Sequence, residues 1–458
     1  MAKYNLEPVE VPTVNTKYRT IRTKLPVPES LEIFRLLQQS EPVSMMGQPP
    51  VVWDKAEGFQ VHDKWGNKWI DWSSGVLITN AGHGRKEIIR AIRKILDQGL
   101  LATYVFVHEK RVELTRMLQL LAPDPGNYQV FLLSTGSEAT ENCIKLAKTY
   151  SLEKYGPSRK YFVTFKNAFH GRTMGAQLAG GMDKQKKWIV DEGRTFIQVP
   201  FPDGYKNQDV SFDLFLKTLK DLNIKPDEVA GVMSESYQGV GPDFFPYDYA
   251  QALAQFCGVN DIPLIADEVQ SGFGRTGKMF AYEHYDIVPD LIACGKGISS
   301  SLPLSAVIGR KDIMGLYAPG SMTSTHSGSP IPVVAAIENL KIIRDENLVE
   351  HAREMGEILI PGLKKIQQKY PAVLGCLQGK GLVAGIQCVK KGTRIPDPEL
   401  ALQLNVSCFH KGLLMFAPVG IEGECIKIAP PLNITPDALL ESLEVFGEAC
   451  DVVIGKNT

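Results

Sequence analysis

Two stretches decide the fold of this chain: Leu264-Ile265-Ala266-Asp267-Glu268-Val269-Gln270-Ser271-Gly272-Phe273-Gly274-Arg275 and Asp290-Leu291-Ile292-Ala293-Cys294-Gly295-Lys296-Gly297. Each contains an apolar run typical of a buried strand, and each run is followed by charged residues and glycine. In parallel α/β sheets, ligands bind outside the carboxyl ends of the strands. The two stretches therefore predict a functional site where Asp267 and Lys296 follow their strands.

Apolar runs continue on both sides of these stretches. A run at residues 129–134 precedes a helical pattern that begins at Ser137, and the other runs lie at residues 161–165, 196–199, 229–233, 262–266, 291–294 and 304–308. Because most of these seven runs alternate with helical stretches, they predict an α/β fold with a mostly parallel seven-stranded sheet. We expect one large domain over residues 81–335. A small α+β domain is expected from both chain ends, residues 1–80 and 336–458.

The composition excludes several classes of protein. The 458 residues include 50 Lys+Arg against 51 Asp+Glu, so the formal net charge is −1 and favours neither a nucleic-acid nor a membrane partner. No apolar run approaches the roughly 20 residues that cross a bilayer, and the first residues do not resemble a secretion signal. The eight cysteines are scattered without CxxC pairs. We expect a cytoplasmic protein with reduced thiols, no metal site and small-molecule partners.

An aspartate and a lysine at neighbouring strand ends suit pyridoxal phosphate chemistry. A lysine amine can attach the cofactor's aldehyde, while an aspartate can keep its ring nitrogen protonated. Taken alone, such a lysine is more often a solvated loop residue, and the pair Asp267-Glu268 is more often a helix cap or a surface pair. Together, the two stretches resemble the signature of class III aminotransferases. That resemblance implies pyridoxal 5'-phosphate as cofactor, fold type I, and Lys296 and Asp267 as the catalytic residues.

The same resemblance implies further cofactor-binding residues. Gly136 and Ser137 belong to a stretch that resembles the family's phosphate loop, where amides at a helix N-terminus face the phosphate. Phe169 would stack on the cofactor ring, and Gln270 would hydrogen-bond its phenolic oxygen. Thr325 would reach the phosphate of the neighbouring subunit, which implies a homodimer or a dimer of dimers. His170, next to Phe169, is expected to support the site rather than to act as the catalytic base.

Substrate-binding residues are expected at Arg172, Val76, Glu235 and Lys427. Arg172 matches the arginine that binds a distal carboxylate in 4-aminobutyrate-type members, as a guanidinium fork can. Two positions depart from the family: Lys427 stands where an arginine commonly binds the keto acid's α-carboxylate, and Val240 replaces the glutamate that shields that arginine. These departures are mutually consistent, because a buried glutamate without a full arginine partner is costly.

These residues predict an ω-amino-acid:2-oxo-acid aminotransferase. The donor candidates are 4-aminobutyrate, taurine and β-alanine, and 2-oxoglutarate is favoured as acceptor because it has a second carboxylate for Arg172. A racemase or epimerase of the same family is the alternative, since residues 303–309 resemble both groups and such a reaction needs no keto acid. A cofactor-free relative is disfavoured because Lys296 and Asp267 are both present.

Overall fold

The computed structural model describes residues 4–190 and 194–455, and the chain divides into two compact units. The larger unit is Lys86–Val349, and the smaller unit combines Met1–Arg85 with Glu350–Thr458. The boundary expected after residue 335 falls inside helix α10 (Pro330–Asp345). Because α10 packs against helices of the larger unit, the chain leaves that unit only after the helix has ended.

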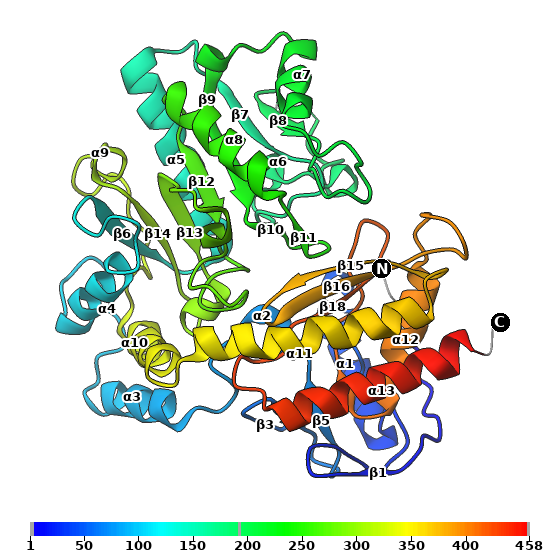
Figure 1. The fold of residues 1–458 in the computed structure, drawn as a ribbon. Helices are drawn as coiled ribbons and strands as arrows, with labels where there is room; N and C mark the ends of the chain where they lie inside the picture. The colour runs from blue at the N-terminus through cyan, green and yellow to red at the C-terminus, as the bar shows by residue number, and fades with distance from the viewer. Residues whose placement is uncertain (1–3, 191–193, 456–458) are drawn as a thin grey trace. The chain divides into compact units, whose positions relative to one another are not determined.

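A seven-stranded sheet forms the centre of the larger unit (Figure 1). In spatial order its strands are β6 (Tyr128–Leu133), β14 (Ser305–Arg310), β13 (Leu291–Cys294), β12 (Leu264–Asp267), β9 (Val229–Glu235), β7 (Tyr161–Phe165) and β8 (Phe196–Val199). Neighbouring strands pair in parallel except at β14, which is antiparallel to both β13 and β6. The mostly parallel seven-stranded sheet predicted from the sequence is confirmed.

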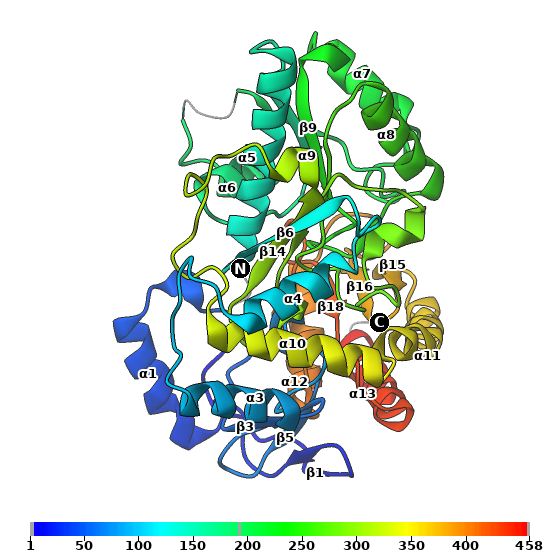
Figure 2. The ribbon, with the colours of Figure 1, turned by 90° about the vertical axis from the view of Figure 1, so that its left-hand side faces the viewer.

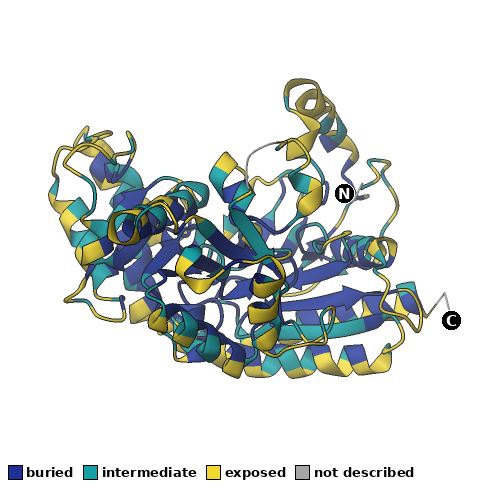
Figure 3. Cartoon of the chain, turned by 90° about the horizontal axis from the view of Figure 1, so that it is seen from above, coloured by how far each residue is buried: buried dark blue, intermediate teal, exposed yellow. Residues whose placement is uncertain are grey.

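Helices cover both faces of this sheet, and its strands are largely buried, as the dark blue arrows of Figure 3 show. One face packs against α5 (Gly136–Tyr155) and α9 (Lys311–Met314), and the other against α7 (Asp213–Asp221) and α8 (Tyr247–Val259). Successive residues of a strand point to opposite faces. Leu264 therefore packs with α7 and α8, while Ile265 packs with α5.

Three further helices of the larger unit pack together, with α10 against both α3 (Lys86–Asp97) and α4 (Glu109–Gln119) (Figure 2). The segment between α3 and α4 is apolar but exposed, since Leu101, Phe106 and Val107 are 56%, 76% and 80% exposed. The unit also contains α6 (Met174–Ala179) and a hairpin of β10 (Tyr237–Gln238) and β11 (Asp243–Phe244). Across residues 4–190 and 194–455, no helix is both long enough and apolar enough to cross a membrane.

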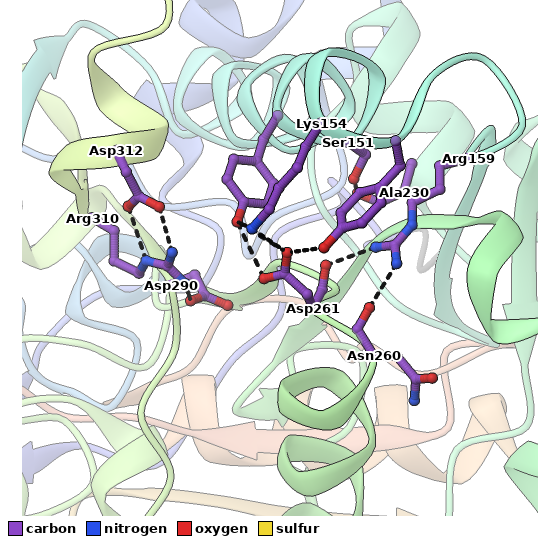
Figure 4. Close-up of polar contacts among 11 residues, drawn as sticks. Ser151, Lys154, Arg159, Ala230, Asn260, Asp261, Asp290, Arg310 and Asp312 are labelled. Carbon is purple, nitrogen blue, oxygen red and sulfur yellow. Dashed lines mark hydrogen bonds and ion pairs between the residues drawn. The ribbon is translucent and has the colours of Figure 1, made fainter.

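Polar contacts anchor the ends of α5 and β12 that lie away from Gly136 and Asp267 (Figure 4). The Asp261 carboxylate accepts a hydrogen bond of 2.6 Å from Lys154, near the end of α5. The Asp290 carboxylate accepts one of 2.8 Å from the N–H of Leu264, the first residue of β12, and one of 2.6 Å from Arg310. These contacts hold the helix and the strand in fixed directions, so that their opposite ends are well placed.

The smaller unit is an α+β structure made from both ends of the chain. Its larger sheet has the order β1 (Val14–Asn15), β2 (Thr20–Ile21), β5 (Lys68–Asp71), β4 (Gln60–His62) and β3 (Lys55–Glu57), with β17 (Leu413–Leu414) parallel to β5. A second, antiparallel sheet has the order β15 (Leu374–Lys380), β16 (Val383–Cys388) and β18 (Cys425–Ile428). The helices are α1 (Leu31–Ser40), α2 (Ser74–Leu77), α11 (Leu348–Lys369), α12 (Pro398–His410) and α13 (Pro436–Ile454). The predicted small α+β domain from both chain ends is confirmed.

The cysteines are mostly buried. Seven of the eight have buried side chains, and only Cys376 is partly exposed. Burial raises the pKa of Cys143 and of Cys294 well above the ordinary value. These thiols therefore behave as apolar core groups rather than as nucleophiles.

Candidate active site

A cavity of about 360 Å³ lies in the larger unit, where β12 and β13 end and α5 begins. Its lining consists of Thr135, Gly136, Ser137, Phe169, His170, Gly171, Arg172, Glu235, Asp267, Val269, Gln270 and Lys296. Eight of the eleven residues predicted from the sequence line this cavity. The exceptions are Thr325, Val76 and Lys427.

Lys296 follows β13 and is held in a strained turn. Its φ of 42° lies in the left-handed region, which a residue with a side chain seldom adopts. The side-chain amide of Asn339 in α10 donates to the carbonyl oxygens of Gly297 and Ile298, at 2.8 and 3.0 Å, and so secures the turn. Burial lowers the pKa of Lys296, although the charges of Asp267 and Glu235 oppose this effect. A lowered pKa increases the fraction of neutral amine, which is the nucleophilic form.

Asp267 is the last residue of β12, and His170 fixes its carboxylate. His170 Nδ1 lies 2.7 Å from Asp267 Oδ2, and Asp267 Oδ1 accepts a hydrogen bond of 3.1 Å from the N–H of Val269. Burial alone would lower the pKa of His170, but the hydrogen bond to Asp267 and the charges of Asp267 and Glu235 raise it above its ordinary value. The pair thus favours a carboxylate held rigidly by an imidazolium.

The N-terminus of α5 presents backbone amides to the cavity. The helix begins with a capping box, in which Thr135 Oγ1 accepts a hydrogen bond from the N–H of Glu138. In return, the Glu138 carboxylate accepts hydrogen bonds from the N–H groups of Thr135, at 2.8 Å, and of Ser134, at 2.9 Å. The N–H groups of Gly136 and Ser137 belong to the first turn, where no carbonyl of the helix can accept them. They are suited to an anion such as a phosphate.

Glycine at position 136 keeps this end of the helix open. A Cβ atom there would come within 2.7 Å of Val269 Cγ1, which is closer than real contacts allow. Val269 therefore packs directly against the backbone of Gly136, and it also lines the cavity. Its part in the cavity was not predicted. The sequence signal that could have indicated it is the position of Val269 directly after two acids at a strand end. An apolar residue at such a position can pack into the core or line a site.

Phe169 and Arg172 lie together on the cavity wall. The N–H of Phe169 donates to Glu235 Oε2 at 2.9 Å, and Arg172 Cζ lies 5.4 Å from the centre of the Phe169 ring. The Arg172 side chain is exposed and donates to Gln185 Oε1 at 3.2 Å. Among the described residues, no carboxylate forms an ion pair with Arg172.

Glu235 lies in the cavity as predicted, but its carboxylate is engaged by the backbone. It accepts hydrogen bonds from the N–H groups of Phe169 and Gly239, at 2.9 and 2.8 Å. Burial and the nearby charge of Asp267 raise the pKa of Glu235 to about 7, although His170 and the two hydrogen bonds oppose the shift. A substrate contact for Glu235 stays a prediction, whereas its contacts position the loop of Phe169.

The two acids of the deciding stretch have different surroundings. Asp267 lines the cavity, whereas the Glu268 side chain is fully buried away from it. The Glu268 carboxylate accepts hydrogen bonds from the N–H groups of Ala281 and Tyr282, both at 2.9 Å, and from Ser271 Oγ at 2.7 Å. Glu268 thus organises the loop that follows β12.

The remaining predicted residues lie elsewhere. Thr325 is exposed on a loop of the larger unit, next to Ser324, whose hydroxyl donates to Glu138 Oε1 at 3.1 Å. Val76 and Lys427 belong to the smaller unit, where Val76 is 42% exposed and Lys427, in β18, is 2% exposed. Their roles toward a substrate stay predictions.

Residues 43–450 match a family model described as aminotransferase class-III. The chain belongs to the class III aminotransferases. Among curated relatives, 4-aminobutyrate aminotransferase of Mycobacterium leprae is 31% identical, over 93% of this chain and 97% of the relative. Alanine/serine racemase of Pyrococcus horikoshii is 30% identical, over 99% and 97%. Among solved structures, an (S)-enantioselective omega-transaminase from Thermomicrobium roseum matches with a TM-score of 0.85 and 27% identity, over 93% of this chain and 99% of that one.

Class III aminotransferases use pyridoxal 5'-phosphate, and the cavity of this aminotransferase fits that group. The amides of Gly136 and Ser137 suit its phosphate, and the space that a side chain at residue 136 would fill is kept open. Asp267, fixed by His170, suits a protonated ring nitrogen, and the Lys296 amine suits an aldehyde carbon. Phe169 and Val269 supply apolar surfaces for a ring.

Proposed function

We propose that this aminotransferase transfers the amino group of an ω-amino acid with a distal anion to a 2-oxo acid. The observation that carries the proposal is Arg172, an exposed guanidinium on the wall of the cavity that contains Lys296, with no ion-pair partner among the described residues. A guanidinium in that position suits a carboxylate or a sulfonate. The donors proposed are 4-aminobutyrate, β-alanine and taurine, and 2-oxoglutarate is the proposed acceptor because its second carboxylate can bind Arg172.

The side chains divide the work among them. Bound pyridoxal phosphate supplies an aldehyde carbon that accepts the amino group and a ring that withdraws electrons from the donor carbon. Lys296 Nζ would hold the cofactor at its aldehyde carbon, and as a neutral amine it would move a proton between the donor carbon and that aldehyde carbon. Asp267 keeps the proton on the ring nitrogen, and His170 holds Asp267 in position. Arg172 binds the distal anion, which places the donor's amine toward Lys296.

The keto acid is proposed to use Lys427 for its α-carboxylate. A lysine provides a single point charge rather than a bidentate fork, so it binds a carboxylate less tightly than an arginine. The valine at position 240, which is 7% exposed, avoids a buried glutamate that a lysine would neutralise poorly. This pair of residues supports an acceptor site different from that of 4-aminobutyrate-type members.

We further propose that the enzyme works in the cytoplasm as a homodimer or a dimer of dimers. Thr325 is exposed and, among described residues, is not part of the lining of the cavity on its own chain, which suits a role at the phosphate of a second copy. The exposed apolar segment at Leu101, Phe106 and Val107 offers surface for such a contact. The buried thiols suit a reducing compartment. Light scattering at working concentration tests the oligomeric state.

The purified enzyme, loaded with pyridoxal phosphate, should be tested with a panel of ω- and α-amino acids, each with 2-oxoglutarate and with pyruvate. The proposal requires turnover of at least one ω-amino donor with a distal anion, and a faster reaction with 2-oxoglutarate than with pyruvate. Turnover of α-amino acids alone would contradict it.

An amino-acid racemase is the second candidate, supported by the racemase relative that matches 99% of this chain. Racemisation needs no keto acid and therefore no α-carboxylate arginine for one, so the lysine at position 427 does not oppose it. Loss of optical activity in a single amino acid without added keto acid would favour this function.

A further inference from the structure

Thr140, on helix α5, holds the loop that carries Arg172 from one side. Its side chain is fully buried and is not part of the cavity lining. The Thr140 hydroxyl donates to the carbonyl oxygen of His170 at 2.8 Å, and it lies 3.0 Å from the carbonyl oxygen of Ser137 in its own helix. Because a hydroxyl has one proton to donate, the shorter contact ties the loop to the first turns of α5.

Glu141, the next residue of α5, holds the same loop from the other side of Arg172. Glu141 Oε1 accepts hydrogen bonds from the hydroxyl of Thr173, at 2.7 Å, and from the N–H of Ala176, at 3.0 Å. Ala176 lies in the first turn of α6, where the amides have no acceptor within their own helix, so Glu141 supplies one. The backbone is thus fixed on both sides of Arg172.

Gly171 allows the loop to lie directly against the start of α5. Its φ of 136° is one that residues with a side chain seldom adopt. A Cβ atom at this position would overlap Ser137 Oγ and come within 2.8 Å of Ala176 Cβ. The residue before Arg172 is therefore packed against the end of the helix whose amides suit a phosphate.

The position of Arg172 depends on these backbone contacts more than on contacts of its own side chain. The side chain is exposed, and among the described residues its hydrogen bond, of 3.2 Å, goes to Gln185. A charge-assisted hydrogen bond requires donor and acceptor about 2.7–2.9 Å apart, and a misplacement of about 1 Å can slow a reaction about 100-fold. A loop that moved away from α5 would take the guanidinium with it.

We propose that Thr140 and Glu141 are positioning residues that set the selectivity of the enzyme for substrates with a distal anion, because they fix the backbone on both sides of Arg172. The inference rests on the proposed function, which assigns the distal anion to Arg172. It adds that recognition of this anion depends on α5, the helix whose first amides suit the cofactor's phosphate. A single helix would thus place both anions.

The test compares 2-oxoglutarate with pyruvate, because only 2-oxoglutarate has a distal carboxylate. In the loaded enzyme, Thr140→Ala and Glu141→Ala should each lower the ratio of kcat/KM for 2-oxoglutarate to that for pyruvate at least threefold, mainly through a higher KM for 2-oxoglutarate. Thr140→Ser and Glu141→Gln should keep the wild-type ratio, since the serine hydroxyl can still donate and the amide oxygen of glutamine can accept both bonds. An effect that reaches Asp267 through His170 would slow both keto acids alike and leave the ratio unchanged.

Ser151→Ala is the matched control. Ser151 is another fully buried hydroxyl residue of α5, and it donates to the carbonyl oxygen of Ala230 on β9 at 2.8 Å. Its removal costs the helix a comparable hydrogen bond far from Arg172, so the ratio should stay at the wild-type value. A ratio lowered as much in Ser151→Ala as in Thr140→Ala would indicate a general loss of stability and would overturn the proposal.

A second readout does not depend on activity. The N–H of Ala176 is bonded to Glu141, and the N–H of Gln177 is bonded to the carbonyl oxygen of Thr173 at 2.7 Å. Hydrogen exchange of these two amides in the loaded enzyme should become at least tenfold faster in Glu141→Ala and stay unchanged in Glu141→Gln and Ser151→Ala. Wild-type exchange in Glu141→Ala would show that Glu141 does not hold the loop, and the proposal would be wrong.

The kinetic outcomes separate this inference from the proposed function. A ratio that falls in Arg172→Ala but in neither Thr140→Ala nor Glu141→Ala would overturn the inference and leave the proposed function standing. A ratio that is unchanged in Arg172→Ala, or the absence of a reaction with either keto acid, would refute the proposed function, and the inference would fail with it.

Discussion

Replacing Arg172 by alanine should separate substrates by the charge that they carry. The guanidinium lies on the cavity wall, with Cζ 5.4 Å from the Phe169 ring, and among the described residues its hydrogen bond, of 3.2 Å, goes to the uncharged amide of Gln185. Little of its charge is therefore neutralised before the substrate arrives. We expect Arg172→Ala to lower kcat/KM for both the ω-amino donor and 2-oxoglutarate. The value for a primary amine without a distal anion should stay unchanged.

The exposure of Arg172 limits the size of the effect. A hydrogen bond to a charged group contributes about 1.5–3 kcal/mol, and solvent screening favours the lower half of that range for an exposed side chain. A loss of about 2 kcal/mol corresponds to a fall of about 30-fold in kcat/KM, since about 1.4 kcal/mol is tenfold. Arg172→Lys keeps the charge but loses the bidentate guanidinium, so the fall in kcat/KM should be smaller than in Arg172→Ala.

The assay is single-turnover kinetics, which measures the donor and acceptor half-reactions separately. Arg35→Ala is the control, because Arg35 is an exposed arginine that pairs with Glu32 on helix α1. If Arg172→Ala slows the reaction of the amine without a distal anion as much as that of the anionic donor, Arg172 supports Phe169 or the cofactor rather than the distal anion. That result would refute the reasoning.

Four other changes test the remaining assignments. Lys296→Ala should abolish turnover, and borohydride reduction of the wild-type enzyme should attach the cofactor to Lys296, as peptide mass mapping can check; a label on another lysine would refute the assignment. Asp267→Asn should lower kcat by orders of magnitude without unfolding the protein, because an amide cannot keep the ring nitrogen protonated; near-normal rates with an unchanged circular dichroism spectrum would exclude that role. Burial raises the folded-state pKa of Glu235 from 4.5 to about 7, so its contribution to the free energy of unfolding is complete below pH 4.5 and is lost as the pH rises toward 7. In urea titrations of the cofactor-free protein, Glu235→Gln should therefore reduce that decline, by up to about 3 kcal/mol, and a parallel decline in both proteins would contradict the burial argument. Lys427→Ala should raise KM for the keto acid and leave the donor half-reaction nearly unchanged, whereas equal losses in both half-reactions would contradict a role specific to the keto acid.

The predictable parts of the structure are those that depend on local pattern. Apolar runs located the strands, and the charged residues after β12 and β13 located the cavity, because a strand's carboxyl end is readable from the sequence. The antiparallel direction of β14 was not predicted, since an apolar run has the same composition in either direction. The separate surroundings of Asp267 and Glu268 could not be distinguished either, because they depend on partners such as His170 and the N–H of Tyr282, which only the folded chain brings beside them.

Backbone conformation was the other part that sequence patterns did not show. The stretch Ser74-Gly75-Val76-Leu77 looks like an ordinary loop, and one glycine does not predict four residues in the left-handed region. That conformation depends on Asp71 and on His83, which lies beyond the turn. It is visible only once those side chains are placed.

The uneven burial of the cysteines gives the enzyme a built-in chemical probe. Alkylating reagents attack thiolates, and seven of the eight side chains are enclosed, leaving Cys376 on β15 as the accessible target in the native state. One equivalent of reagent should therefore mark the folded protein at a single position in the smaller unit. Each additional equivalent of reagent consumed would mean that a buried cysteine has become accessible. Labelling of Cys143 and Cys294 would report unfolding of the larger unit, and labelling of Cys408 and Cys450 unfolding of the smaller one. Thiol counting under mild denaturant can thus show which unit loses its structure first.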